Sequence, residues 1–101
     1  MSGFSDLPLH DGVLQRIEYD WQKRSIRLDI SAFIEPGEPA VPHNLTFMGV
    51  QSLVCPQKDP WGPSMYINKP RSAPGHFVLE MQSGDEIVVE AAGFEFTRAA
   101  S

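Results

Sequence analysis

The sequence is poor in cysteine and in long apolar runs, and each shortage excludes a class of protein. Its single cysteine, Cys55, cannot form an intrachain disulfide, so nothing indicates an oxidising compartment. No apolar run approaches the ~20 residues that a membrane helix requires. The first residues, MSGFSDLPLH, have neither the basic start nor the apolar stretch of a secretory signal. We therefore expect one cytoplasmic domain over residues 1–101, without a membrane segment.

Basic residues are also scarce. Eight Lys and Arg residues stand against 13 Asp and Glu residues, which gives a net charge of -5. The densest basic group, Lys23, Arg24 and Arg27, surrounds an expected turn and is typical of a solvated loop. Nucleic-acid binding needs clustered Lys and Arg to contact phosphates, so we expect no nucleic-acid partner. A basic protein surface would suit this chain better.

Helical periodicity is absent, and alternation of apolar and polar residues dominates instead. Residues 9–34 hold two alternating runs separated by a short charged break at Gln22, Lys23 and Arg24, a pattern that predicts an antiparallel hairpin. Later in the chain, Ser83–Asp85 separates two further alternating runs and predicts a second hairpin. Because 42% of the residues are hydrophobic, a single core can form without a metal or disulfide.

Glycine and proline mark the expected breaks between strands. Gly49 interrupts a predicted strand over residues 44–54 and indicates a β-bulge or a bend, and Gly93 interrupts the last strand and indicates a β-bulge. Residues 35–43 carry three prolines and are expected to form a loop, and residues 1–8 a loosely held tail. The fold predicted is all-β, with five or six antiparallel strands arranged as a curved sheet, a small sandwich or a partly open barrel.

Residues 55–75 form the least regular part, with five prolines and at most a short strand near residues 64–68. A long irregular segment in a small domain is often functional. Trp61 and Tyr66 within it offer large, rigid surfaces for partner binding, although Trp61 could instead cover an open end of the core. Phe33, on an otherwise polar strand face, is a second candidate contact, and exposed strand edges make a homodimer possible.

Residues with catalytic or metal-binding chemistry are present but not in a diagnostic pattern. His10 and Asp11 could pair as a base and its orienting carboxylate, yet no nucleophile or metal accompanies them, and a turn role is the simpler interpretation. His10, His43 and His76 have no metal-binding spacing, so we expect no metal site. Cys55 is interpreted as a small hydrophobic residue. Acidic residues that alternate with arginine along the first hairpin predict cross-strand ion pairs.

The motifs LHDGVLQRIEYDW and SIRLDI resemble the opening of a group of small bacterial β proteins. These proteins have a Leu-His-Asp start and an Asp-Trp strand end, and some are immunity-type proteins of polymorphic toxin systems. The matching positions are Leu9, His10, Asp11, Leu14, Ile17, Asp20 and Trp21. The segment MQSGDEIVVEA (residues 81–91) resembles the serine-glycine-aspartate hairpin of the same group. The resemblance implies a β fold of this size and transfers no catalytic residues.

Two functions from different classes follow as hypotheses. The first is a non-enzymatic binding protein, immunity-like, that holds a protein partner through its strand faces and the loop with Trp61 and Tyr66. The alternative is a small-molecule-binding or enzymatic domain with a cavity lined near His10, Asp11 and His76. Self-association is a third possibility. No cofactor is expected under any of them.

Overall fold

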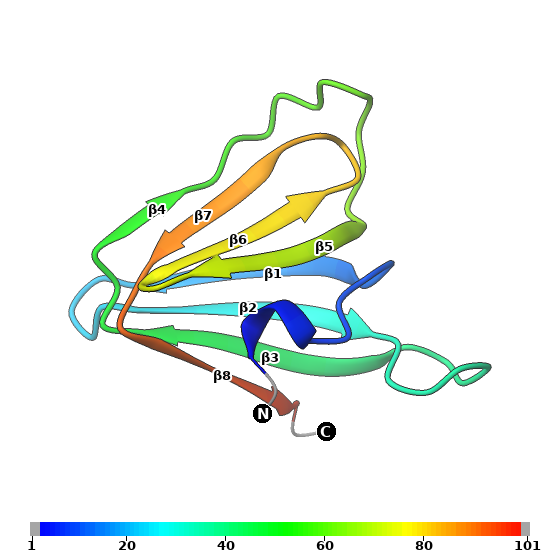
Figure 1. Ribbon diagram of the computed structural model, residues 1–101, viewed down its shortest axis with the longest axis horizontal. Helices are drawn as coiled ribbons and strands as arrows, with labels where there is room; N and C mark the ends of the chain where they lie inside the picture. Colours follow the sequence, from blue (N-terminus) through cyan, green and yellow to red (C-terminus); the bar gives the residue numbers. More distant parts are fainter. Residues whose placement is uncertain (1–2, 100–101) are drawn as a thin grey trace.

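The computed structural model describes residues 3–99, which form eight antiparallel strands in two four-stranded sheets (Figure 1). Sheet A has the strand order β1-β2-β3-β8, and sheet B has the order β4-β7-β6-β5. The strands are β1 (Val13–Asp20), β2 (Ser25–Ala32), β3 (Val41–Met48), β4 (Ser52–Val54), β5 (Ile67–Ala73), β6 (His76–Met81), β7 (Glu86–Glu90) and β8 (Gly93–Arg98). The all-β prediction is confirmed. The predicted number of strands was too low, and the two sheets do not close into a barrel.

The first hairpin forms as predicted, with β1 paired to β2 from Val13↔Ser31 to Asp20↔Ser25. Its inner face carries the four fully buried residues of β2: Ile26, Leu28, Ile30 and Ala32. Alternating side chains of a strand point to opposite faces, so one face of β2 enters the core and the other faces water. The second predicted hairpin also forms, between β6 and β7.

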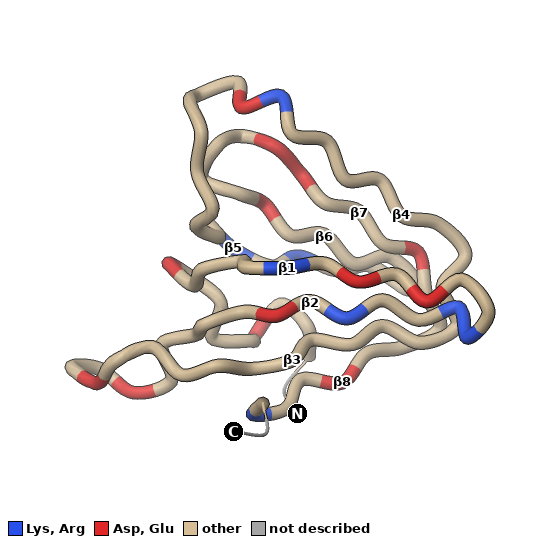
Figure 2. The backbone as a smooth tube through the Cα atoms, turned by 180° about the vertical axis from the view of Figure 1, so that it is seen from behind, with Lys and Arg blue, Asp and Glu red and all other residues tan. Residues whose placement is uncertain are grey.

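Charged residues of both signs occur along β1 and β2 (Figure 2). Arg16 lies 2.7 Å from Glu18, and Arg27 contacts Glu18 across the strands and Asp29 at 3.1 Å. The Arg27–Glu18 pair confirms the predicted cross-strand pairing, and the other two pairs each lie within one strand. All of them are solvent-exposed, so each adds little to stability.

Gly49 and Gly93 mark the two places where the chain passes from one sheet to the other. Gly49 separates β3 in sheet A from β4 in sheet B, and Gly93 begins β8 after β7. The Ala92 N–H donates to the carbonyls of Met48 (2.9 Å) and Gly49 (3.2 Å), which ties the two crossings together. Gly49 forms a bend, which was the alternative to a β-bulge at this position, whereas the β-bulge predicted at Gly93 is wrong: the β3–β8 register runs without a shift as far as Met48↔Gly93.

Two proline-containing segments that we expected to be irregular are partly strands. β3 already begins at Val41 and includes Pro42, and β5 covers residues 67–73 with Pro70 inside it. Proline is tolerated at both places because Pro42 stands at the start of its strand and β5 is an edge strand paired with β6. The irregular part is thus confined to residues 55–66.

The N-terminal segment is packed against both sheets rather than loose. Phe4–Asp6 forms a 3-10 turn, η1, and Phe4 is only 2% exposed. The Phe4 ring lies 5.8 Å from Phe47 in sheet A and 5.1 Å from Phe77 in sheet B, measured between ring centroids. Residues 1 and 2 of the expected tail lie outside the described residues. Within residues 3–99, no helix is long and apolar enough to span a membrane.

Candidate functional site

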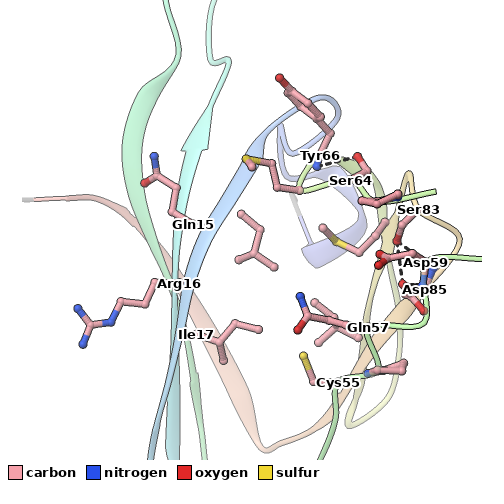
Figure 3. Close-up of a pocket in the computed structure, with 16 residues that line it drawn as sticks. Gln15, Arg16, Ile17, Cys55, Gln57, Asp59, Ser64, Tyr66, Ser83 and Asp85 are labelled. Atoms are coloured by element: carbon pink, nitrogen blue, oxygen red, sulfur yellow. Dashed lines mark hydrogen bonds between the residues drawn. The ribbon is translucent and has the colours of Figure 1, made fainter.

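A cleft of about 720 Å³ opens between strand β1 and the irregular segment 55–66 (Figure 3). Its floor includes Met81 and Ile87, two residues on the inner face of sheet B. Leu14 and Ile17 of β1 form one wall, and residues of the 55–66 segment form the other. We call this hollow the intersheet cleft. Its volume falls within the range of about 300–1,000 Å³ that is typical of ligand pockets.

A β-bulge in β1 explains why two residues three apart in the sequence both face the cleft. The β1–β2 register shifts between Leu14 and Arg16, which makes Gln15 the extra residue. Leu14 pairs with Ile30 and Ile17 pairs with Leu28, so both face inward with those buried partners. Strict alternation would put Leu14 and Ile17 on opposite faces, and the bulge brings them to the same face.

The opposite wall is held by the carboxylate of Asp85, which lies just after the β6–β7 turn. Asp85 accepts hydrogen bonds from the backbone N–H of Lys58 (3.1 Å) and of Asp59 (2.9 Å), and from the Ser83 hydroxyl (2.9 Å). Burial alone would raise the pKa of Asp85, but these hydrogen bonds and the nearby Lys58 charge lower the pKa below its ordinary value. The ionised Asp85 side chain therefore fastens the 55–66 segment to sheet B.

Trp61 provides a second fastening at the same turn. Its backbone N–H donates to the Ser83 carbonyl (2.9 Å), and its ring lies against Gly84, where a Cβ would come within 2.9 Å of ring carbons. Trp61 is nevertheless 75% exposed. It therefore does not cover an open end of the core, and its outer ring face is available for contact.

Cys55 lies on the loop wall, and its sulfur points into the cleft (Figure 3). Partial burial raises the pKa of the thiol, and the Asp85 carboxylate raises it further. A raised pKa keeps the thiol protonated and weakens it as a nucleophile. Cys55 is nevertheless exposed, so the expectation of a buried small hydrophobic residue is not met.

Tyr66 lies at the boundary between the intersheet cleft and a second, shallower hollow of about 600 Å³. This second hollow is lined by His10, Asp11, Phe33, Tyr66 and Gln82. Asp11 Oδ1 accepts a hydrogen bond from Gln82 Nε2 (2.7 Å), and His10 Nδ1 lies 2.7 Å from the Asn68 carbonyl. The carbonyl can only accept, so Nδ1 carries the proton and His10 Nε2 is left 3.5 Å from Asp11. The structure thus brings together four predicted candidates: His10, Asp11, Phe33 and Tyr66.

The remaining histidines lie elsewhere. His76 pairs with Glu90 on sheet B (3.4 Å), and His43 is buried and stacked on Phe96 at 4.7 Å. His76 does not line the hollow that contains His10 and Asp11. Across the part of the chain that the structure describes, no three His, Cys, Asp or Glu side chains are grouped so that they could hold a metal ion.

The cleft itself was missed in the sequence, although its rim residues carry a signal. Met65 and Tyr66 are large apolar or aromatic residues that remain 58% and 47% exposed at the end of a proline-rich segment. Their position opposite β1 depends on an isolated bridge between Val13 and Tyr66 that no local pattern predicts. No protein-family model, curated protein or solved structure matches this chain.

Proposed function

We propose that this chain is a protein-binding domain that acts without catalysis, and that its partner contacts the mouth of the intersheet cleft. The observation that carries this proposal is the cleft itself, which has an apolar floor and an exposed rim formed by Met65 and Tyr66. Binding energy in protein interfaces is concentrated where an anchor side chain enters such a pocket, with Tyr and Trp prominent among the contacts. Phe33, beyond Tyr66 in the second hollow, extends the same surface.

The polar groups of the cleft support a binding role rather than a chemical one. Asp85 is engaged by three donors that hold the 55–66 segment. Cys55 has a raised thiol pKa. Both groups therefore serve the shape of the cleft.

The net charge of -5 favours a basic partner, because complementary charge speeds association and excludes partners of like charge. The resemblance of the N-terminal hairpin to immunity-type proteins points in the same direction. In that group the partner would be a toxin protein, so we propose an immunity-like role. A homodimer through an exposed strand edge is the competing proposal.

Site-directed photo-crosslinking in the native host would test the role of this surface. A photoreactive phenylalanine replaces Tyr66 at the cleft rim, and in a matched control it replaces Thr97 on the far edge of sheet A. We expect the Tyr66 variant alone to give one discrete covalent adduct with another protein. An adduct with a second copy of this chain would support the homodimer, and the absence of any adduct specific to Tyr66 would contradict the proposal.

A second candidate function, small-molecule binding, is favoured by the second hollow. Gln82 and Asn68 fix the Asp11 carboxylate and the His10 ring, and an oriented carboxylate beside an imidazole suits a small polar ligand. His76, part of the predicted cavity, lies outside this hollow. Screening small polar compounds by amide chemical shifts would test it: shifts confined to Asp11, Phe33 and Gln82 would support this function, and their absence would contradict it.

A further inference from the structure

The edge of strand β1 is only half covered. At its N-terminal end, residues 65–67 lie beside residues 12–14, with hydrogen bonds from Leu14 N–H to the Met65 carbonyl (2.9 Å) and from Ile67 N–H to the Gly12 carbonyl (2.8 Å). Over residues 16–20, the described chain provides no strand partner for β1 except β2. An edge strand presents unpaired backbone N–H and C=O groups that can pair with another strand.

The start of this free edge faces the intersheet cleft, because Arg16 and Ile17 are among the residues that line it. In Figure 2, strands β6, β7 and β4 of sheet B follow one another beyond β1, and Figure 3 shows Ile17 pointing across the cleft towards Gln57 and Cys55. A strand added to β1 would lie about 4.8 Å from it, above the cleft floor that includes Met81 and Ile87. The edge and the apolar floor therefore suit one occupant, an extended segment.

We propose that an extended segment of a basic partner protein adds to β1 antiparallel along residues 16–20, so that its alternate side chains enter the intersheet cleft. This inference rests on the proposed protein-binding function and specifies how the partner is held. The segment continues the line of pairing that residues 65–67 begin. Five residues of free edge correspond to about 17 Å of extended chain.

The two faces of the added segment have different chemistry. Side chains that point into the cleft meet Ile17, Met81 and Ile87, and are therefore apolar. Side chains that point outward lie beside Arg16, Glu18 and Asp20 on the outer face of β1. Glu18 already pairs with Arg16 and Arg27, so Asp20 is the carboxylate that favours Lys or Arg in the added segment. The segment alternates apolar and basic residues.

Charge also favours a partner protein over a second copy of this chain. The cleft lining contains two carboxylates, Asp59 and Asp85, and one cation, Arg16. Arg16 points away from the cleft and pairs with Glu18 at 2.7 Å (Figure 3). Two copies would bring net charges of -5 and -5 together, which opposes association.

A heptapeptide probe tests the inference directly. The probe is acetyl-Lys-Ile-Lys-Val-Lys-Ile-Lys-amide, with variants carrying Leu or Phe at the apolar positions, and the control replaces every Lys by Glu. Titrated into isotopically labelled protein at millimolar concentration, the Lys peptides should shift the backbone amides of residues 16–20, and the Glu peptides should not. Failure of every Lys peptide to shift these amides would overturn the inference.

N-methylation of the probe separates strand addition from attraction by charge alone. Alternate amides of an antiparallel strand point to the same edge, so methylating one alternate set blocks pairing with β1 and methylating the other set does not. Because several backbone hydrogen bonds are lost together, we expect one series to bind about tenfold more weakly or worse, and the other series to bind as before. Equal binding of the two series would overturn the inference.

Two variants locate the binding. Ile17→Lys places a charge on the inward face of the free edge, and Met65→Lys places one on the exposed rim, where folding is not at risk. Both should abolish the amide shifts caused by the Lys peptides, whereas Thr97→Lys, on the edge strand β8, should leave them unchanged. If Met65→Lys binds the probe normally, the cleft is not the site. If photo-crosslinking at Tyr66 gives a protein adduct but no Lys peptide binds, the protein-binding function stands and strand addition is contradicted. If photo-crosslinking at Tyr66 gives no adduct, the protein-binding function itself is contradicted.

Discussion

Gly49 combines a positive φ with a close contact at the crossing between the two sheets. Its φ is +64°, and a Cβ at this position would lie 2.7 Å from the Ala92 Cβ. Gly49→Ala should therefore lower the free energy of unfolding by about 2–3 kcal/mol, through left-handed strain and the clash together. Urea denaturation monitored by circular dichroism would measure the loss.

Gly37 provides the matched control for Gly49. Its φ is +81°, but nothing lies within 4 Å of the position of an added Cβ. Gly37→Ala should cost only the strain, about 1–2 kcal/mol. An equal decrease in unfolding free energy for the two variants would show that the contact with Ala92 adds nothing to the cost of Gly49→Ala.

Asp85 makes the stability of the protein depend on pH. Its folded-state pKa is lowered, so its contribution is fully present above the pKa of the unfolded chain and is lost as the pH falls through the folded-state pKa. Asp85→Asn should therefore destabilise the protein at neutral pH, with a difference from wild type that shrinks at acidic pH. Denaturation midpoints at pH 7 and pH 3 would measure this, with Asp59→Asn as the control. A constant difference across pH would contradict the assignment.

The Cys55 thiol reports on the same carboxylate. Because Asp85 raises the pKa of Cys55, its removal lowers that pKa and increases the thiolate fraction at a given pH. Asp85→Asn should therefore be alkylated a few-fold faster than wild type at pH 8 under native conditions. Loosening of the segment would lower this pKa as well, because less burial favours the thiolate. Amide hydrogen exchange in residues 55–66 separates the two effects: unchanged exchange with faster alkylation assigns the change to the Asp85 charge, and faster exchange assigns it to loosening.

At the level of single elements, the bulge at Gln15 sets the phase of β1. Deleting Gln15 would leave Leu14, Arg16 and Ile17 in regular alternation, with Leu14 and Ile17 still facing inward. Deleting Glu18 would instead reverse the faces on one side of the deletion. We expect the first deletion to change the unfolding free energy by about 1 kcal/mol or less and the second by several times more, measured by urea denaturation. Similar losses would show that the bulge has another role.

The hairpins were predictable from sequence because their pairing is local. In each hairpin the two alternating runs pair with each other, and they are joined directly by the turn at Trp21–Arg24 or at Ser83–Asp85. The intersheet cleft was not predictable, because it depends on contacts between distant segments, such as those of Asp85 with Lys58 and Asp59. The prediction was wrong at Pro42 and Pro70. Proline lacks the backbone N–H, so it disrupts a strand only where that N–H would face a neighbouring strand.

Across the whole molecule, Phe4 joins the two sheets from outside the strands. Its ring is buried against Phe47, Phe77 and Phe94, so its removal leaves a cavity shared by both sheets. Phe4→Ala should lower the unfolding free energy by about 3–5 kcal/mol in one cooperative transition. Phe33→Ala, at a 45% exposed position, should cost less than about 1 kcal/mol. A small effect of Phe4→Ala would mean that the N-terminal turn is dispensable.

The strand order of sheet A has a consequence for how the protein is made. β8 pairs with β3, yet every strand of sheet B lies between them in the chain. During translation, sheet A therefore cannot be completed until all of sheet B has left the ribosome, because β3 has no β8 to pair with before then. A nascent chain arrested before residue 93 would expose the edge of β3, and a chaperone that binds unpaired strands would recognise it at that stage.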